Sequence, residues 1–191
     1  MNSPLIVCAL EDEFNIKTEI FSLLYTGVGK VNAAISLTEY ILLNKKPSYV
    51  INYGTAGSKR IKVGRIVDCT KFIQRDMDAS KLGFDLFETP FEDKDSKKID
   101  YSFFSQNPTR NLLTCASGDS FLASSSSHPG DVVDMEAYSL AKVCRKFSIP
   151  FISFKYISDS ADGDAGYDWE KNLKKGQQLF VETVLVPLNL L

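Results

Sequence analysis

Histidine is scarce in this sequence, and cysteine pairs with the spacing of a zinc site are lacking. There is one histidine, His128, and there are four cysteines, none of them in a C-x-x-C pair. Three of the cysteines lie inside apolar runs, where a small buried thiol is the ordinary explanation. His128 follows a serine run and precedes Pro129-Gly130, a setting that favours a surface turn over catalysis. The sequence therefore indicates neither a zinc site nor a disulfide framework.

Excess charge and long hydrophobic runs are also lacking. The net charge is −2 and the pI is near 5.5, which gives no electrostatic footprint for nucleic acid or an anionic membrane. The first apolar run, residues 5–10, has no basic flank and meets acidic residues directly, so it is too short for a signal peptide or a membrane span. We expect a cytoplasmic protein that binds a small ligand of little charge.

Familiar phosphate-binding and dinucleotide-binding motifs are missing. Gly27 and Gly29 precede a helical pattern, but they lack the spacing of a G-x-x-x-x-G-K-[ST] loop and the third glycine of a dinucleotide fingerprint. We therefore expect no cofactor. A second glycine pair occurs in residues 54–57, after a predicted strand. It is either a plain tight turn or a turn that brings N–H groups and one hydroxyl, from Gly54 and Thr55, close to a ligand.

What is present fits an α/β fold. The chain has 191 residues, of which 44% are hydrophobic and 24% charged, and this suits one compact domain, residues 1–191. Apolar and β-branched runs predict strands at residues 4–10, 19–25, 49–53, 66–74, 111–116, 132–133 and 151–157. Helical spacing predicts helices at residues 30–45, 137–147 and 168–186, the last with Asp168 as its N-cap. The alternation predicts a covered, parallel or mixed sheet.

The predicted helix at residues 30–45 follows the turn that contains Gly27 and Gly29. Helical spacing assigns an inward face to one set, namely Val31, Ala34, Ile35, Thr38, Ile41 and Leu42.

The strand at residues 151–157 is the one around which the rest is organised. It runs into residues 158–164, which hold three aspartates among small residues. Open α/β sheets place their chemistry at such strand ends, which makes these three carboxylates candidate site residues. The alternative is a polar turn whose Asp and Ser side chains merely cap the next helix.

The first strand also ends in acid, at residues 11–13. These acids are either a solvated loop or a group of which one member faces a pocket at the strand's carboxyl end.

Six short motifs then occur in a fixed order along nearly the whole chain: Ala-Leu-Glu-Asp-Glu at 9–13, Gly-Val-Gly-Lys-Val-Asn-Ala-Ala at 27–34, Asn-Tyr-Gly-Thr-Ala-Gly at 52–57, Ser-Gly-Asp-Ser-Phe at 117–121, Asp-Met-Glu-Ala at 134–137 and Ile-Ser-Asp-Ser-Ala-Asp at 157–162. Together they resemble the purine nucleoside phosphorylase and nucleosidase superfamily, most closely its methylthioadenosine/S-adenosylhomocysteine nucleosidase branch. The resemblance implies a single α/β domain with a central mixed sheet, partly closed like a barrel and surrounded by helices. It also implies assembly as a homodimer or higher homo-oligomer.

The resemblance further implies roles for individual residues. Asp159, with Ser158 beside it, would protonate the purine at N7. Glu136 would bind the ribose hydroxyls, and Glu13 would position and activate water. The other residues expected at the substrate are Met135 on the sugar, Phe121 and Leu122 at the base, and Gly54, Thr55 and Trp169.

The chemistry needs these residue types on independent grounds. Cleavage of an N-glycosidic bond passes through an oxocarbenium-like sugar while charge moves onto the base. An acid at the base and carboxylates near the sugar lower that barrier. The acidic first loop would repel phosphate, and Asn52 stands where related phosphorylases have an arginine, so water is the expected nucleophile.

The expected function is therefore hydrolysis of a purine nucleoside, such as the adenine nucleoside methylthioadenosine. Two alternatives stay open. One is a phosphorylase that holds phosphate through residues such as Arg75, and the other is a catalytically degenerate nucleoside-binding protein. The sequence departs from the family pattern between Glu13 and Gly27, where a helix and a hairpin are usual. It departs again at Tyr53, which could narrow the site or replace a missing wall.

Overall fold

A computed structural model of the chain describes residues 3–92, 96–120, 128–161 and 166–191, with the backbone alone for residues 166–172. Its strands form a single sheet that curls on itself. The strands of the closed ring are β3 (Val50–Gly57), β8 (Phe151–Asp159), β4 (Ile66–Gln74), β6 (Leu113–Ser117) and β7 (Val132–Asp134), and β7 returns to β3. The closure between β7 and β3 is the antiparallel pair Gly57 and Val133.

Three further strands extend this ring. β1 (Leu5–Cys8) lies parallel to β3, and β2 (Ser22–Tyr25) lies parallel to β1. β5 (Ile99–Asp100) adds to β4 in the antiparallel direction. The expected mixed, partly barrel-like sheet is thus confirmed.

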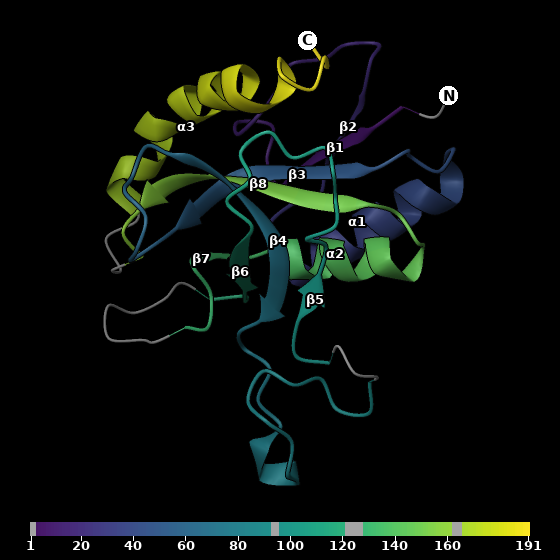
Figure 1. The fold of residues 1–191 in the computed structure, drawn as a ribbon, viewed down its shortest axis with the longest axis vertical. Coiled ribbons are helices and arrows are strands. Elements are labelled where there is room, and N and C mark those ends of the chain that lie inside the picture. The colour runs from purple at the N-terminus through teal and green to yellow at the C-terminus, as the bar shows by residue number, and fades with distance from the viewer. Residues whose placement is uncertain (1–2, 93–95, 121–127, 162–165) are drawn as a thin grey trace.

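Helices cover both faces of the sheet (Figure 1). α1 (Lys30–Leu43) and α2 (Ala137–Lys146) pack together on one face, and α3 (Gly166–Phe180) with its continuation Val181–Leu185 covers the other. Successive side chains of β1 lie on opposite sides of the sheet. Leu5 and Val7 belong to the core under α1 and α2, and Ile6 and Cys8 belong to the core under α3. Burial on both faces explains why this strand is a continuous apolar run.

Of the inward face predicted for α1, Ile41 is confirmed as buried, but the face as a whole is misplaced. Ala33, Leu37 and Ile41 are its buried residues, whereas Val31, Ile35 and Leu42 are 66%, 60% and 67% exposed. Apolar side chains occur on several sides of this helix, so their spacing alone does not identify the side that packs against the core.

Several predicted boundaries also differ. β3 runs through Gly57, so residues 54–57 are strand and not a turn, because β8 pairs with β3 along its whole length. β8 likewise continues through Asp159. β2 begins at Ser22 and not at residue 19. α3 begins at Gly166, which places Asp168 inside the helix and excludes it as the N-cap.

Tyr53 does not narrow a site. Its ring is buried and stacks on Phe180 of α3 with the ring centroids 4.1 Å apart. Phe14 packs edge-on against both rings, and Phe21 lies beside Phe14. The short segment between β1 and β2 is therefore fixed by the aromatic core under α3.

No helix in the described part of the chain is both long enough and apolar enough to cross a lipid bilayer.

Candidate functional site

Glu13 is the one buried member of the first acidic loop. Glu11 and Asp12 are exposed, whereas Glu13 turns inward. Its Oε1 accepts hydrogen bonds from the N–H of Thr55 at 2.9 Å and from the Thr55 hydroxyl at 3.1 Å. Its Oε2 accepts from the N–H of Leu10 at 3.3 Å. The carboxylate is therefore fixed against the carboxyl-terminal half of β3.

The side chains of Glu13 and of the buried Lys155 both lie next to Gly54. A methyl group at Gly54 would lie 3.3 Å from Glu13 Oε1 and 3.6 Å from Nζ of Lys155. Lys155 comes from the neighbouring strand β8, where it pairs with Gly54 in the ladder. Gly54 thus leaves space beside both the Glu13 carboxylate and the Lys155 ammonium group.

Lys155 forms an ion pair with Asp134 at the end of β7. Asp134 also accepts hydrogen bonds from the Ser117 hydroxyl and from the N–H of Ala137. Burial acts to raise the pKa of Asp134, but the Lys155 ammonium and these hydrogen bonds hold it below its ordinary value. Burial likewise acts to lower the pKa of Lys155, and Asp134 overcomes this and raises it. Both groups are charged at neutral pH.

Glu136 lies two residues after Asp134, at the N-cap position of α2. Its Oε1 accepts a hydrogen bond of 2.8 Å from the N–H of Gly29, which has a φ of 96° that favours glycine. Burial raises the pKa of Glu136 to about 7, and the negative charge of Asp134 adds to the rise, while Lys155 and the Gly29 N–H oppose it. Glu136 is therefore a carboxyl group that titrates near neutrality.

Asp159 is the last residue of β8. Its Oδ2 accepts a hydrogen bond of 2.7 Å from the Ser158 hydroxyl, and its Oδ1 accepts one of 2.9 Å from the N–H of Ala161. A methyl group at Gly57 would lie 2.6 Å from Asp159 Oδ1, so glycine is needed where this side chain crosses β3. The side chain is half-buried, unlike the fully buried Ser158.

Two of the acidic residues predicted for the site thus lie against the end of β3. Glu13 is held at Thr55, and Asp159 lies at Gly57, two residues further along the strand. Glu136 is close enough to Glu13 for the two charges to interact. Met135, next to Glu136, is half-buried. Phe121 and Leu122 lie outside the described residues, as does the side chain of Trp169.

Arg75, the residue considered for phosphate, is engaged by a neighbouring loop. Its guanidinium donates hydrogen bonds to the carbonyl oxygens of Gly118 and Ser120 and to the Ser120 hydroxyl. Within the described residues, no group of three or more His, Cys, Asp or Glu side chains is placed to hold a metal ion.

Lys155 and Asp134 were not singled out from the sequence. The sequence does contain a signal for Lys155, because it is the one charged residue in the run at residues 151–157, which is typical of a covered strand. A lysine buried on such a strand needs a carboxylate partner. The partner itself, at the end of β7, could not be read from the sequence.

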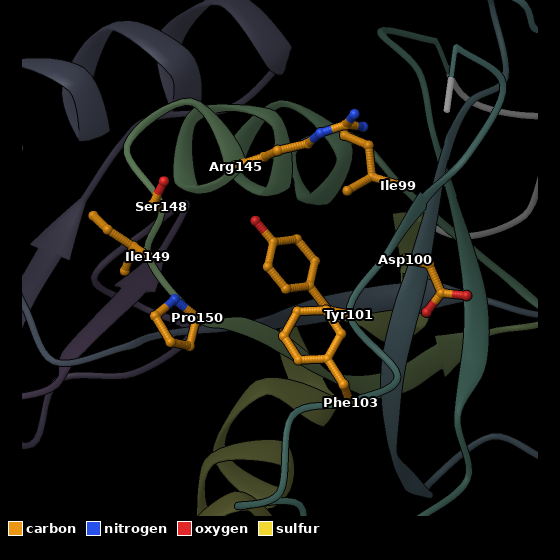
Figure 2. Close-up of a pocket in the computed structure, with 8 residues that line it drawn as sticks. All are labelled: Ile99, Asp100, Tyr101, Phe103, Arg145, Ser148, Ile149 and Pro150. Atoms are coloured by element: carbon orange, nitrogen blue, oxygen red, sulfur yellow. The ribbon is translucent and has the colours of Figure 1, made fainter. Parts of the chain in front are cut away.

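A cavity of about 380 Å³ opens at the other end of β8 (Figure 2). Its walls are Ile99, Asp100, Tyr101, Phe103, Arg145, Ser148, Ile149 and Pro150. Pro150 precedes the first residue of β8, whereas Asp159 is the last residue of that strand. The cavity therefore lies away from the acid cluster, and we assign it no part in the chemistry.

Comparisons with known proteins agree with this arrangement of motifs. The model of the phosphorylase superfamily matches residues 13–185. A 5′-methylthioadenosine/S-adenosylhomocysteine nucleosidase of Actinobacillus succinogenes is 35% identical over 193 residues, covering 92% of this chain and 82% of that protein. A nucleosidase of the same name from Staphylococcus aureus is 32% identical over 177 residues, covering 83% of this chain and 77% of that protein.

Solved structures share the fold. That of 5′-methylthioadenosine/S-adenosylhomocysteine nucleosidase from Helicobacter pylori has a TM-score of 0.81 at 23% identity, covering 100% of this chain and 99% of that one. That of a futalosine hydrolase mutant from Helicobacter pylori has a TM-score of 0.83 at 22% identity, covering 100% of both chains. The chain belongs to the phosphorylase superfamily and, within it, to the family of 5′-methylthioadenosine/S-adenosylhomocysteine nucleosidases.

Proposed function

We propose that the protein hydrolyses the N-glycosidic bond of a purine nucleoside, an adenine nucleoside such as methylthioadenosine, and releases base and sugar. The observation that carries this proposal is the grouping of Glu13, Asp159 and Glu136 around the end of β3 and the start of α2. Membership in a family of nucleosidases supports it.

In the proposed reaction, a water oxygen forms a bond to C1′ of the sugar while the bond from C1′ to the base nitrogen breaks. The electron pair of that bond passes to the base, and Asp159 supplies a proton at N7. Glu13 takes the proton that the attacking water loses. General acid and base groups of this kind each accelerate a reaction by roughly a hundredfold to ten-thousandfold.

Glu136 recognises the sugar in this proposal. One carboxylate oxygen is held by the N–H of Gly29, and the other is offered to the ribose hydroxyls, with Met135 against the sugar. Ser158 supports Asp159, and Thr55 with Gly54 supports Glu13. We place Trp169 at the substrate as well, on the family resemblance.

Water is favoured over phosphate as the nucleophile on electrostatic grounds. The Glu13 carboxylate would repel a phosphate dianion placed to attack the sugar, and Arg75 is hydrogen-bonded to residues 118 and 120. Within the described residues, Arg75 therefore gives the phosphorylase alternative no support.

We also propose that the protein works in the cytoplasm as a homodimer or larger homo-oligomer. Four free buried thiols fit a reducing compartment. The exposed apolar side chains of α1, Val31, Ile35 and Leu42, fit a contact between copies. Light scattering during size-exclusion chromatography would test the assembly, and a monomeric mass would contradict it.

A panel of purine nucleosides, incubated with the purified protein with and without phosphate, tests the activity. Release of adenine with free sugar as the other product, at a rate independent of phosphate, is expected. Sugar 1-phosphate would make the protein a phosphorylase. Binding without any product would make it a nucleoside-binding protein.

A further inference from the structure

The N-terminus of α1 has no cap of its own. Its N-cap residue is Gly29, no side chain of the neighbouring sequence caps it, and its first turn holds no acidic residue. The first N–H groups of a helix have no partner inside the helix, and the helix dipole favours negative charge beside them.

Two carboxylates from distant parts of the chain supply the missing cap. Glu136 Oε1 accepts a hydrogen bond of 2.8 Å from the N–H of Gly29, and Asp119 Oδ1 accepts one of 2.8 Å from the N–H of Lys30. Glu136, which is proposed to bind the sugar, and Asp119 are thus held by the N–H groups of two consecutive residues, Gly29 and Lys30.

Asp119 is itself held by a small ionic cluster, which we call the latch and define as Lys30, Asp76 and Asp119. The Lys30 ammonium forms ion pairs with both aspartates, and Asp76 Oδ2 accepts a hydrogen bond of 3.0 Å from the N–H of Asp119. The Lys30 side chain is 12% exposed, whereas those of Asp76 and Asp119 are 32% and 44% exposed, so water screens these pairs in part. Burial acts to raise the pKa of Asp76, but its bonds to Lys30 and Asp119 hold that pKa below its ordinary value.

We propose that Lys30, Asp76 and Asp119 are positioning residues for the sugar-binding carboxylate, because they fix the helix end whose Gly29 N–H orients Glu136. This inference rests on the proposed function, in which Glu136 meets the sugar. With one oxygen fixed at Gly29, the carboxylate presents its other oxygen in one direction. Without the Lys30 ammonium, Asp76 and Asp119 repel each other and the helix end is no longer fixed.

The test compares three variants with the parent by steady-state kinetics on the best nucleoside and by thermal unfolding. Lys30→Met should raise KM by about fivefold, the scale of one carboxylate at a helix terminus, and leave kcat within about twofold. Lys30→Arg keeps a cation between the two aspartates and should stay within about twofold of the parent in KM. Lys97→Met removes an exposed ion pair with Asp85 elsewhere on the surface and should change neither constant.

A double variant separates positioning from general loosening of the fold. If the latch acts through Glu136, adding Lys30→Met to Glu136→Gln should raise KM by less than about twofold, because the group to be positioned is already altered. An undiminished fivefold effect in the Glu136→Gln background would overturn the proposal. So would a Lys30→Met variant with the KM of the parent.

Failure of the proposed function would be recognised separately, because the parent itself would then release no base from any nucleoside. The latch remains testable in that case through the carbon-13 chemical shift of the Glu136 carboxyl group as a function of pH. Lys30→Met should raise the pKa of Glu136, since the Gly29 N–H that stabilises its charged form is no longer fixed. An unchanged titration would overturn the proposal without any reference to activity.

Discussion

Nζ of Lys155 lies 2.7 Å from Oδ2 of Asp134, and both side chains are 1% exposed. Removing one member of a buried pair leaves the other charge without compensation, at a cost of roughly 3–5 kcal/mol. Lys155→Met should therefore lower the free energy of unfolding in urea at pH 7 by about that amount. Lys155→Met with Asp134→Asn should be less destabilised than Lys155→Met alone.

The matched control is Lys17→Met. Lys17 lies 4.0 Å from Glu11, and the side chains of this pair are 74% and 63% exposed, so the free energy of unfolding should change by less than about 0.5 kcal/mol. A Lys155→Met variant as stable as the control would mean that the buried pair is not charged in the folded protein.

Asp159→Asn should lower kcat for base release by about a hundredfold or more, because the amide keeps the shape of the side chain but cannot supply the proton. The hydrogen bond from the Ser158 hydroxyl can persist, so the melting temperature should change little. Asp78→Asn, at an exposed carboxylate in the loop after β4, is the control and should keep the parent rate. Turnover of Asp159→Asn within a few-fold of the parent would remove Asp159 from the role of acid.

Sugar recognition should depend on pH through Glu136. Its pKa is about 7, so the ionised form that accepts hydrogen bonds from two hydroxyls accumulates as the pH rises above that value. KM should therefore fall between about pH 6 and pH 8 for the parent. For Glu136→Gln it should be higher and independent of pH in this range. Parallel pH profiles for the two proteins would exclude Glu136 as the titrating group.

The same shift affects stability. At a pH between 4.5, the ordinary pKa of a glutamate, and about 7, Glu136 is protonated in the folded protein but already ionised in the unfolded chain. Stability should therefore fall as the pH rises through this window, by an amount on the order of 3 kcal/mol. In Glu136→Gln this loss should be absent, and urea unfolding at pH 5 and pH 8 would measure it.

Glu13→Gln should abolish base release even in concentrated phosphate, because an amide cannot take the proton that water loses. The amide oxygen can still accept from the N–H of Thr55, so folding should be preserved. Glu11→Gln is the control, since Glu11 is exposed and should keep the parent rate. Activity of Glu13→Gln that returns with added phosphate would point to phosphorolysis and direct attention to Arg75.

Much of this fold follows from the sequence because several strands, such as β1 and β8, are covered on both faces and are predominantly apolar runs. β4 has the predicted bounds, and β8 differs from its prediction only by two added residues. Continuous apolar runs report burial directly, and the polar residues at the end of β8 indicated where chemistry could lie.

The rest depended on contacts between distant residues. Glycines 54 and 57 suggest a turn locally, and only the long ladder with β8 makes them strand. The buried face of α1 was set by its contact with α2, not by the helix's own pattern. The pairs Lys155 with Asp134 and Lys30 with Asp119 join positions far apart in the chain, where no local spacing rule applies.

The bonds that hold Glu13 come from Leu10 and Thr55, and Asp159 crosses β3 at Gly57, so the separation of these acids is set by the strand and its neighbours. In the segment that follows Glu13, the rings of Phe14 and Phe21 pack in the aromatic core beneath α3. A change of length in this front segment should therefore alter the packing beneath α3 before it alters the distance between the two acids.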